Sequence, residues 1–226
     1  MIAILEEEAV DPGAAPARAV GLSLESGLRD QGEQAVVVAG AWTSGDEVAD
    51  VLARTEEAHG PLRAVVLASA GDAATLEGDL VEIDPAQWHR RVELPLQRTL
   101  ACFQGTHRRL RVSGGSLVVL VPTLALVGAS GFVPWAVVAE GQRSLAKAAA
   151  RAWGHDRITV NCVAVPGALL APSGSPDRPG QPDAALARPP DLRHEMASVV
   201  ASVVSDGWTG VTGATIAVDG GVWMTP

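Results

Sequence analysis

Short runs of aliphatic residues alternate along the chain with longer segments in which apolar residues recur every three or four positions. Consecutive apolar positions are typical of strands buried on both faces of a parallel sheet, whereas the longer spacing favours helices. Six strands are predicted, at residues 2–5, 35–38, 64–67, 117–121, 158–163 and 215–218. Five helices are predicted between and after them, at residues 15–30, 45–59, 84–110, 134–153 and 192–205.

This alternation predicts an α/β fold with an open, mostly parallel sheet covered by helices on both faces. The chain of 226 residues suits one domain, and no internal repeat divides it. We therefore expect residues 1–226 to form a single domain. The Pro-, Gly- and Ser-rich segment 171–190 is expected to be its one long irregular loop.

Composition narrows the function classes. The net charge of −9 argues against nucleic acid as a partner. The two cysteines, Cys102 and Cys162, have no metal-ligand spacing, so a reducing, cytoplasmic compartment is expected. The chain contains no tyrosine, which excludes any mechanism with tyrosine as acid, base or nucleophile.

Residues 112–139 carry no charge, so their length raises the question of a membrane span. Pro122, Gly128, Gly131 and Pro134 divide this stretch, which favours a strand, a loop and the start of a helix. At the N-terminus, an apolar run is followed at once by acidic residues, unlike a secretory signal. We expect neither a signal peptide nor a membrane partner.

Several motifs in consistent order resemble the short-chain dehydrogenase/reductase family. Residues 211–221, Val-Thr-Gly-Ala-Thr-Ile-Ala-Val-Asp-Gly-Gly, resemble its C-terminal signature, and residues 158–167 resemble its strand and Pro-Gly turn with one extra residue. Residues 115–120 resemble its fifth strand, 88–100 its fourth helix, and 68–71 stand where it usually has Asn-Asn-Ala-Gly. The resemblance implies a Rossmann-like, doubly wound sheet.

The family's catalytic side chains are missing from this alignment. Members use a tyrosine as general acid/base, a lysine that lowers its pKa, a serine that holds the substrate and an asparagine in a proton relay. These positions fall on Trp135, Ala139, Pro122 and Pro95, respectively. None of the four replacements can perform the original step. Trp135 is open to two interpretations, as the lining of a pocket or as part of the core or an interface.

The family's cofactor site is also altered. Members place a Gly-rich turn after the first strand, where backbone N–H groups meet the pyrophosphate of a nicotinamide dinucleotide. Here that segment supplies one glycine and several carboxylates that would repel phosphate, namely Glu6, Glu7, Glu8, Asp11 and Gly13. The acidic adenine contact after a later strand falls on Ala41. We expect the chain itself to bind no cofactor.

The N-terminal half is shorter than in the family by about one βα unit. Only the strand at 35–38 lies between the first strand and the one at 64–67, so six strands are expected in all. The 35–38 strand is therefore predicted to pair directly beside the first strand. This would remove the sheet edge at which the adenosine half binds.

Other candidate sites have simpler interpretations. The basic groups at 89–91 and 107–111 could hold a phosphate or a carrier protein, but a solvated helix face and a helix C-terminus favoured by the dipole are the preferred interpretation. His194 and Glu195 could exchange protons, or could simply be exposed near a helix start. Carboxylates 6–8 with Asp11 could bind a metal, although such residues in a loop usually stay solvated, and no metal site is expected.

The resemblance therefore implies a non-catalytic subunit that pairs with an active, NAD- or NADP-binding relative in a hetero-oligomer. Two-subunit enzymes of this kind occur in the family, such as the pair that forms β-ketotyrosine in aminocoumarin biosynthesis. The implied contacts are helices 84–110 and 134–153 and the C-terminal strand, which could also join two copies of this chain. Two alternatives are an enzyme with unfamiliar chemistry and a stand-alone ligand-binding regulator.

Overall fold

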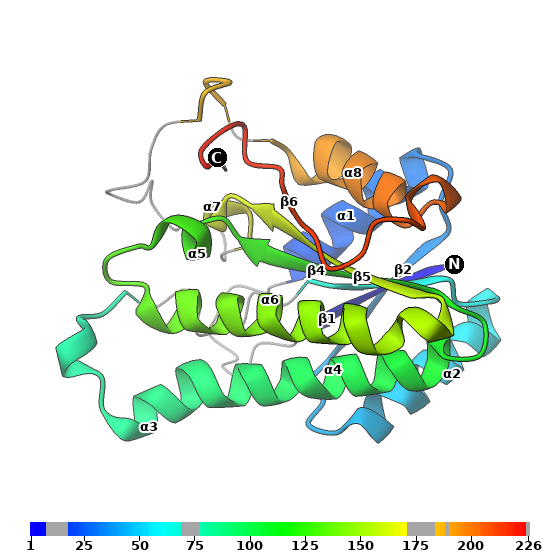
Figure 1. The fold of residues 1–226 in the computed structure, drawn as a ribbon, viewed down its shortest axis with the longest axis horizontal. Helices are drawn as coiled ribbons and strands as arrows, with labels where there is room; N and C mark the ends of the chain where they lie inside the picture. The colour runs from blue at the N-terminus through cyan, green and yellow to red at the C-terminus, as the bar shows by residue number, and fades with distance from the viewer. Residues whose placement is uncertain (8–17, 69–76, 171–183, 189, 225–226) are drawn as a thin grey trace.

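A computed structural model of the chain contains one parallel six-stranded sheet (Figure 1). The structure describes residues 1–7, 18–68, 77–170, 184–188 and 190–224. The strand order is β2-β1-β3-β4-β5-β6, and every neighbouring pair is parallel, so the predicted fold class is confirmed. The strands are β1 Ile2–Glu7, β2 Ala35–Gly40, β3 Ala64–Leu67, β4 Gly115–Pro122, β5 Ile158–Val165 and β6 Thr215–Ala217.

Strand β2 pairs directly with β1, as predicted from the shortened N-terminal half, with Ile2 opposite Ala35. Several strand boundaries differ from the prediction, and the end of β1 matters most for the carboxyl edge of the sheet. β1 continues through Glu6 and Glu7, which the sequence had placed in a solvated loop, and Glu7 lies opposite Gly40 of β2. The ladder with β2 extends past the aliphatic run because backbone pairing does not depend on the side chain.

The helices follow the predicted ranges closely. They include α1 Arg18–Asp30, α2 Gly45–His59 and α6 Val133–Trp153, and the last predicted helix is divided into η5 Leu192–Met196 and α8 Ala197–Val203. Short helical turns that the sequence did not indicate are η2 Leu80–Glu82, α5 Leu124–Val127, η4 Gly154–Asp156, α7 Gly167–Leu170 and η6 Asp206–Trp208. Most of the predicted irregular loop at 171–190 lies outside the described residues. No helix within the described ranges is long and apolar enough to cross a membrane.

The predicted helix at 84–110 is continuous in course but not in hydrogen bonding. It consists of α3 Pro85–Trp88, a π-helical turn η3 His89–Glu93, and α4 Leu94–Leu110. The backbone N–H of Leu94 bonds the carbonyl of His89, five residues earlier. The next residue, Pro95, has no N–H to return to Arg91, so the regular i to i−4 ladder cannot be completed here.

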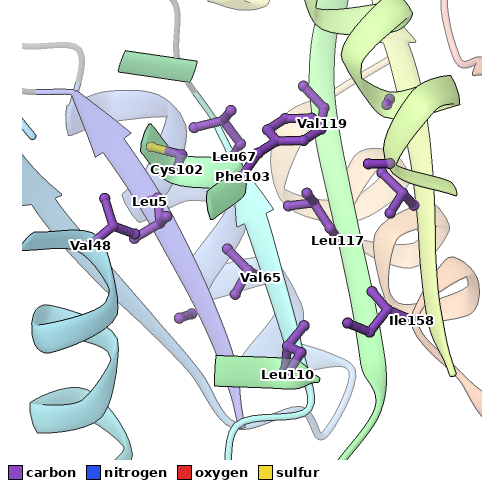
Figure 2. Packing of buried hydrophobic residues seen from close by; sticks show 14 of the residues in the cluster. Leu5, Val48, Val65, Leu67, Cys102, Phe103, Leu110, Leu117, Val119 and Ile158 are labelled. Atoms are coloured by element: carbon purple, nitrogen blue, oxygen red, sulfur yellow. The ribbon is translucent and has the colours of Figure 1, made fainter. Parts of the chain in front are cut away.

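Two hydrophobic clusters cover the two faces of the sheet. α2, α4 and α6 pack on one face, and α1 and α8 pack on the other (Figure 1). Figure 2 shows the first cluster, in which Leu5, Val65 and Val119 of adjacent strands lie near Phe103 of α4 and Val48 of α2. Successive residues of a strand point to opposite faces, so Ile4 joins the second cluster while Leu5 joins the first.

The contact between α2 and α4 depends on a glycine. A Cβ at Gly105 would lie 2.5 Å from the Cβ of Val48 and 2.8 Å from the backbone nitrogen of Ala49. We expect Gly105→Ala to lower the free energy of unfolding by about 1–3 kcal/mol through overpacking. Gly154→Ala is the matched control, because Gly154 has a right-handed helical backbone and open space around it. Urea denaturation followed by circular dichroism compares the two, and equal destabilisation would contradict the packing argument.

Candidate functional site

The carboxyl ends of all six parallel strands meet at one edge of the sheet, which is where open α/β sheets bind their ligands. The segments that follow β1 and β3, residues 8–17 and 69–76, lie outside the described residues. Glu8, Asp11 and Gly13 belong to the first of these. The described part of the edge comprises Glu6 and Glu7, the end of β2, and the segments that join β4 to α6 and β5 to α7.

Glu6 is fully buried at this edge. Its Oε1 accepts a hydrogen bond of 3.1 Å from the backbone N–H of Gly21, in the first described turn of α1. A Cβ at Gly21 would lie only 2.5 Å from Oε2 of the same carboxylate. A carboxylate is favourable near the N-terminal end of a helix because the helix dipole is positive there. The carboxyl group of Glu6 therefore occupies space beside α1 that is open because Gly21 has no side chain.

Glu7 points to the opposite face of the sheet and is also buried, with 8% of the residue exposed. Its Oε1 lies 3.3 Å from Nη1 of Arg98, which α4 supplies. The prediction that these carboxylates stay solvated is therefore wrong for both Glu6 and Glu7. A buried carboxylate needs hydrogen bonds or an opposite charge, and α1 and α4 supply one of each.

Trp135, at the tyrosine position, is buried in the first turn of α6 with 3% exposed. Its indole lies against Gly167, where α7 begins after β5, because a Cβ at Gly167 would be 3.0 Å from Cη2 of the ring. The same Cβ would be 3.1 Å from Leu124. This packing supports the interpretation of Trp135 as part of the core and not as the lining of a pocket. The ring fills space between the ends of β4 and β5.

The other three family positions also carry buried, non-ionisable side chains. Pro122 is the last residue of β4, Ala139 lies in the first hydrophobic cluster, and Pro95 is buried in α4. Thr123, beside the serine position, is 1% exposed, and its Oγ1 has no hydrogen-bond partner among the described residues. A hydroxyl sealed in this way cannot meet a substrate without local movement.

At the carboxyl end of β2, the sequence assigns the adenine-contact position to Ala41 and does not indicate a role for Trp42. Ala41 is exposed and has no functional group. Trp42 instead covers the end of the strand, since a Cβ at Gly40 would lie 2.6 Å from Cε2 of its indole. A glycine two residues before a tryptophan was the available signal, because in an extended chain these residues share a face.

Most of the remaining polar residues that were candidates for a binding or proton-transfer site bond another side chain of this chain. His89 bonds Glu93 at 2.8 Å, and His194 bonds Asp191 at 3.1 Å, both exposed as expected. Arg91 departs from the expected solvated surface, because it is buried with 8% exposed. No group of three or more metal-binding side chains occurs within the described part of the chain.

Two further polar candidates have defined partners. His107 bonds Asp156 at 2.9 Å and stacks on Trp153, with ring centroids 4.9 Å apart. Glu195 pairs with Arg188 at 2.8 Å, and the hydrogen bonds from that guanidinium lower the pKa of Glu195 to about 2. The lowered pKa keeps Glu195 ionised near neutral pH, so it is not poised to donate a proton there.

None of the four family positions lines a cavity of about 580 Å³ that lies between α6 and the edge strand β6. Its lining combines two cations, one carboxylate, one hydroxyl, three aliphatic side chains and one indole. These belong to Arg143, Lys147, Glu140, Thr215, Ala125, Leu126, Ala217 and Trp223. The cavity could not be predicted from the sequence, because its residues come from two regions, 125–147 and 215–223, that meet only in the folded chain.

Comparison with known proteins identifies the family of this chain. A family model described as enoyl-(acyl carrier protein) reductase matches residues 23–223. The chain belongs to the short-chain dehydrogenase/reductase family. It is 33% identical over 203 residues to cis-4-hydroxycyclohexanecarboxylate dehydrogenase of Sinomonas cyclohexanicum, covering 86% of this chain and 79% of the relative.

Two further members of the short-chain dehydrogenase/reductase family extend the comparison. The 3-oxoacyl-[acyl-carrier-protein] reductase FabG of Staphylococcus epidermidis is 26% identical over 202 residues, covering 87% of this chain and 81% of the relative. A solved short-chain dehydrogenase/reductase from Burkholderia xenovorans superposes with a TM-score of 0.71 at 19% identity, over 98% of this chain and 95% of that one. The last comparison supports the fold alone.

The two cysteines generate a prediction about reactivity. Both thiols are free and buried, and burial raises the pKa of Cys102 and of Cys162 from 9 to about 12. We expect both to resist alkylation at pH 8 in the folded protein and to react on unfolding. The folded state should also lose stability as the pH rises above 9, because only the unfolded thiols ionise there. Mass spectrometry after iodoacetamide treatment, with and without urea, measures the first effect, and rapid native labelling would contradict it.

Proposed function

We propose that this chain is a non-catalytic member of the short-chain dehydrogenase/reductase family. It pairs with an active NAD- or NADP-dependent relative and stabilises or shapes the site of that partner. The observation that carries the proposal is the burial of Trp135 and Ala139 at the positions of the family's tyrosine and lysine. Indole N–H does not exchange protons near neutral pH, and alanine has no charge with which to tune a pKa.

The surroundings of Glu6 support the absence of a cofactor in this chain. In the family, backbone N–H groups after the first strand meet the pyrophosphate of the dinucleotide. Here the carboxylate of Glu6 takes the N–H of Gly21, and Glu7 adds a second carboxylate at the same strand end. A phosphate beside α1 would lie near the carboxylate of Glu6, which already accepts the N–H of Gly21, so these residues do not fit a dinucleotide.

The surface formed by α4 and α6 supports pairing with a second subunit. The two helices lie side by side, and a Cβ at Gly141 of α6 would be 2.5 Å from Leu96 of α4 (Figure 1). Their outer surface exposes Leu100 at 43% and Val137 at 36%. Small and apolar residues on adjacent helices allow close packing by the helices of a partner. The edge strand β6 adjoins this region through α6 and offers a second contact.

The named relatives suggest the substrate class of the partner. One is a dehydrogenase of a hydroxycyclohexanecarboxylate, and another is a reductase of 3-oxoacyl groups on a carrier protein. Both names describe interconversion of a secondary alcohol and a ketone. We therefore propose that the active partner transfers hydride between a nicotinamide and a hydroxy or keto substrate, such as a hydroxyacyl thioester.

Co-expression tests the proposal directly. The chain is produced with a relative from the same organism that retains the serine, tyrosine and lysine, and the mass of the purified complex is measured. NAD and NADP are then titrated into each chain alone by calorimetry. We expect a stable mixed complex in which only the partner binds the dinucleotide. Dinucleotide binding or dehydrogenase activity by this chain alone would overturn the proposal, as would failure to associate with any intact relative.

A matched pair of substitutions tests the proposed surface. Leu100→Asp places a charge on the exposed side of α4. Leu22→Asp places a charge on α1, which lies on the other face of the sheet and where Leu22 is 52% exposed. We expect Leu100→Asp to weaken the mixed complex at least about ten-fold, because a carboxylate would be desolvated in the contact. Leu22→Asp should leave the affinity unchanged. Equal effects in analytical ultracentrifugation would contradict the assignment of α4.

A further inference from the structure

The cavity between α6 and β6 contains a fixed guanidinium. Nε of Arg143 donates a hydrogen bond of 3.1 Å to Oγ1 of Thr215, and Nη1 pairs with Glu140 one turn earlier. The Arg143 side chain is only 17% exposed. A guanidinium has five N–H donors, and these two contacts use two of them. Arg143 is therefore held in position with donors still available toward the cavity.

Lys147 adds a second cation one helical turn beyond Arg143, on the same side of α6. It is exposed, and it forms no ion pair within the part of the chain that the structure describes. The two cations face one carboxylate, Glu140, which leaves the cavity with a net positive charge although the whole chain carries −9. Both cations also act on the buried thiol of Cys162, where they oppose the rise in its pKa.

The rest of the lining is mainly apolar, and part of it is also held in place. Ala125 and Leu126 contribute aliphatic surface, and Trp223 contributes its indole. The backbone N–H of Trp223 donates a 3.0 Å hydrogen bond to Asp219, a buried carboxylate that also accepts from Gly221 at 2.9 Å. This turn fixes the backbone from which the indole extends.

We propose that this cavity binds a small organic anion, in which a carboxylate or phosphate group is attached to a compact apolar body. The anionic group meets Arg143 and Lys147, since a guanidinium can bond two oxygens of either group at once. The apolar body packs against Trp223 and Leu126. The volume of about 580 Å³ lies within the range of small-molecule pockets. None of the four family positions lines this cavity, and binding there does not require a dinucleotide.

The test uses benzoate and phenyl phosphate as probes, with benzamide as a neutral analogue of benzoate. Each is titrated into the full-length chain, and binding is followed by NMR at the indole N–H of Trp223, assigned with Trp223→Phe. We expect both anions to shift this signal in a saturable manner and benzamide to leave it unchanged. The stronger of the two anions identifies the preferred charged group.

Lys147→Gln should weaken binding of the preferred anion about ten-fold, which corresponds to the loss of one charge-assisted hydrogen bond. Arg151→Gln is the matched control, because it removes the same charge from an exposed position of α6 that does not line the cavity. It should change the affinity less than two-fold. Equal effects of the two substitutions, equal binding of benzamide, or the absence of saturable shifts would each overturn the proposal.

Discussion

Strand β1 determines the character of this protein, because it is hydrogen-bonded on both edges and covered on both faces. β2 and β3 occupy its edges, α1 lies on one face, and α2 and α4 lie on the other. A side chain on such a strand has no access to water and must find its partners inside the protein. The ladder with β2 runs through Glu7, so two carboxylates fall under this constraint. Gly21 and Arg98 satisfy them at the edge where a Rossmann-like sheet otherwise receives a ligand.

The overall architecture could be predicted from the sequence because it depends on patterns that are local. Each buried strand is an aliphatic run, and the missing βα unit leaves only one place for the strand at 35–40, beside β1. The family's four catalytic positions were also assigned by counting from motifs, and that assignment stays a prediction. Burial of Glu6 and Glu7 could not be predicted, because it depends on how far a strand pairs with its neighbour. The cavity beside β6 could not be predicted from local patterns either, because α6 and the C-terminal turn meet only in the folded chain.

A protein of this kind separates the two tasks that a Rossmann-like sheet usually combines. The sheet, its two helical layers and the C-terminal turn around Asp219 depend on hydrophobic packing and backbone hydrogen bonds. Acid–base chemistry depends on a few side chains at the carboxyl edge, and the residues proposed to replace them, Trp135 and Ala139, are buried and apolar. Fold and chemistry can therefore change independently, and membership of an oxidoreductase family does not by itself assign a reaction.

The π-helical turn before α4 has a consequence for comparing this helix with those of relatives. A turn that contains an extra residue rotates everything beyond it by about 100° relative to an uninterrupted α-helix. Counting seven residues from Trp88 across η3 therefore does not settle which residue faces the place of the family's asparagine. Correcting the count by one residue in either direction leads to Leu94 or Leu96 instead of Pro95. All three side chains lack a hydrogen-bonding group, so each alignment of this helix leaves the relay without its amide.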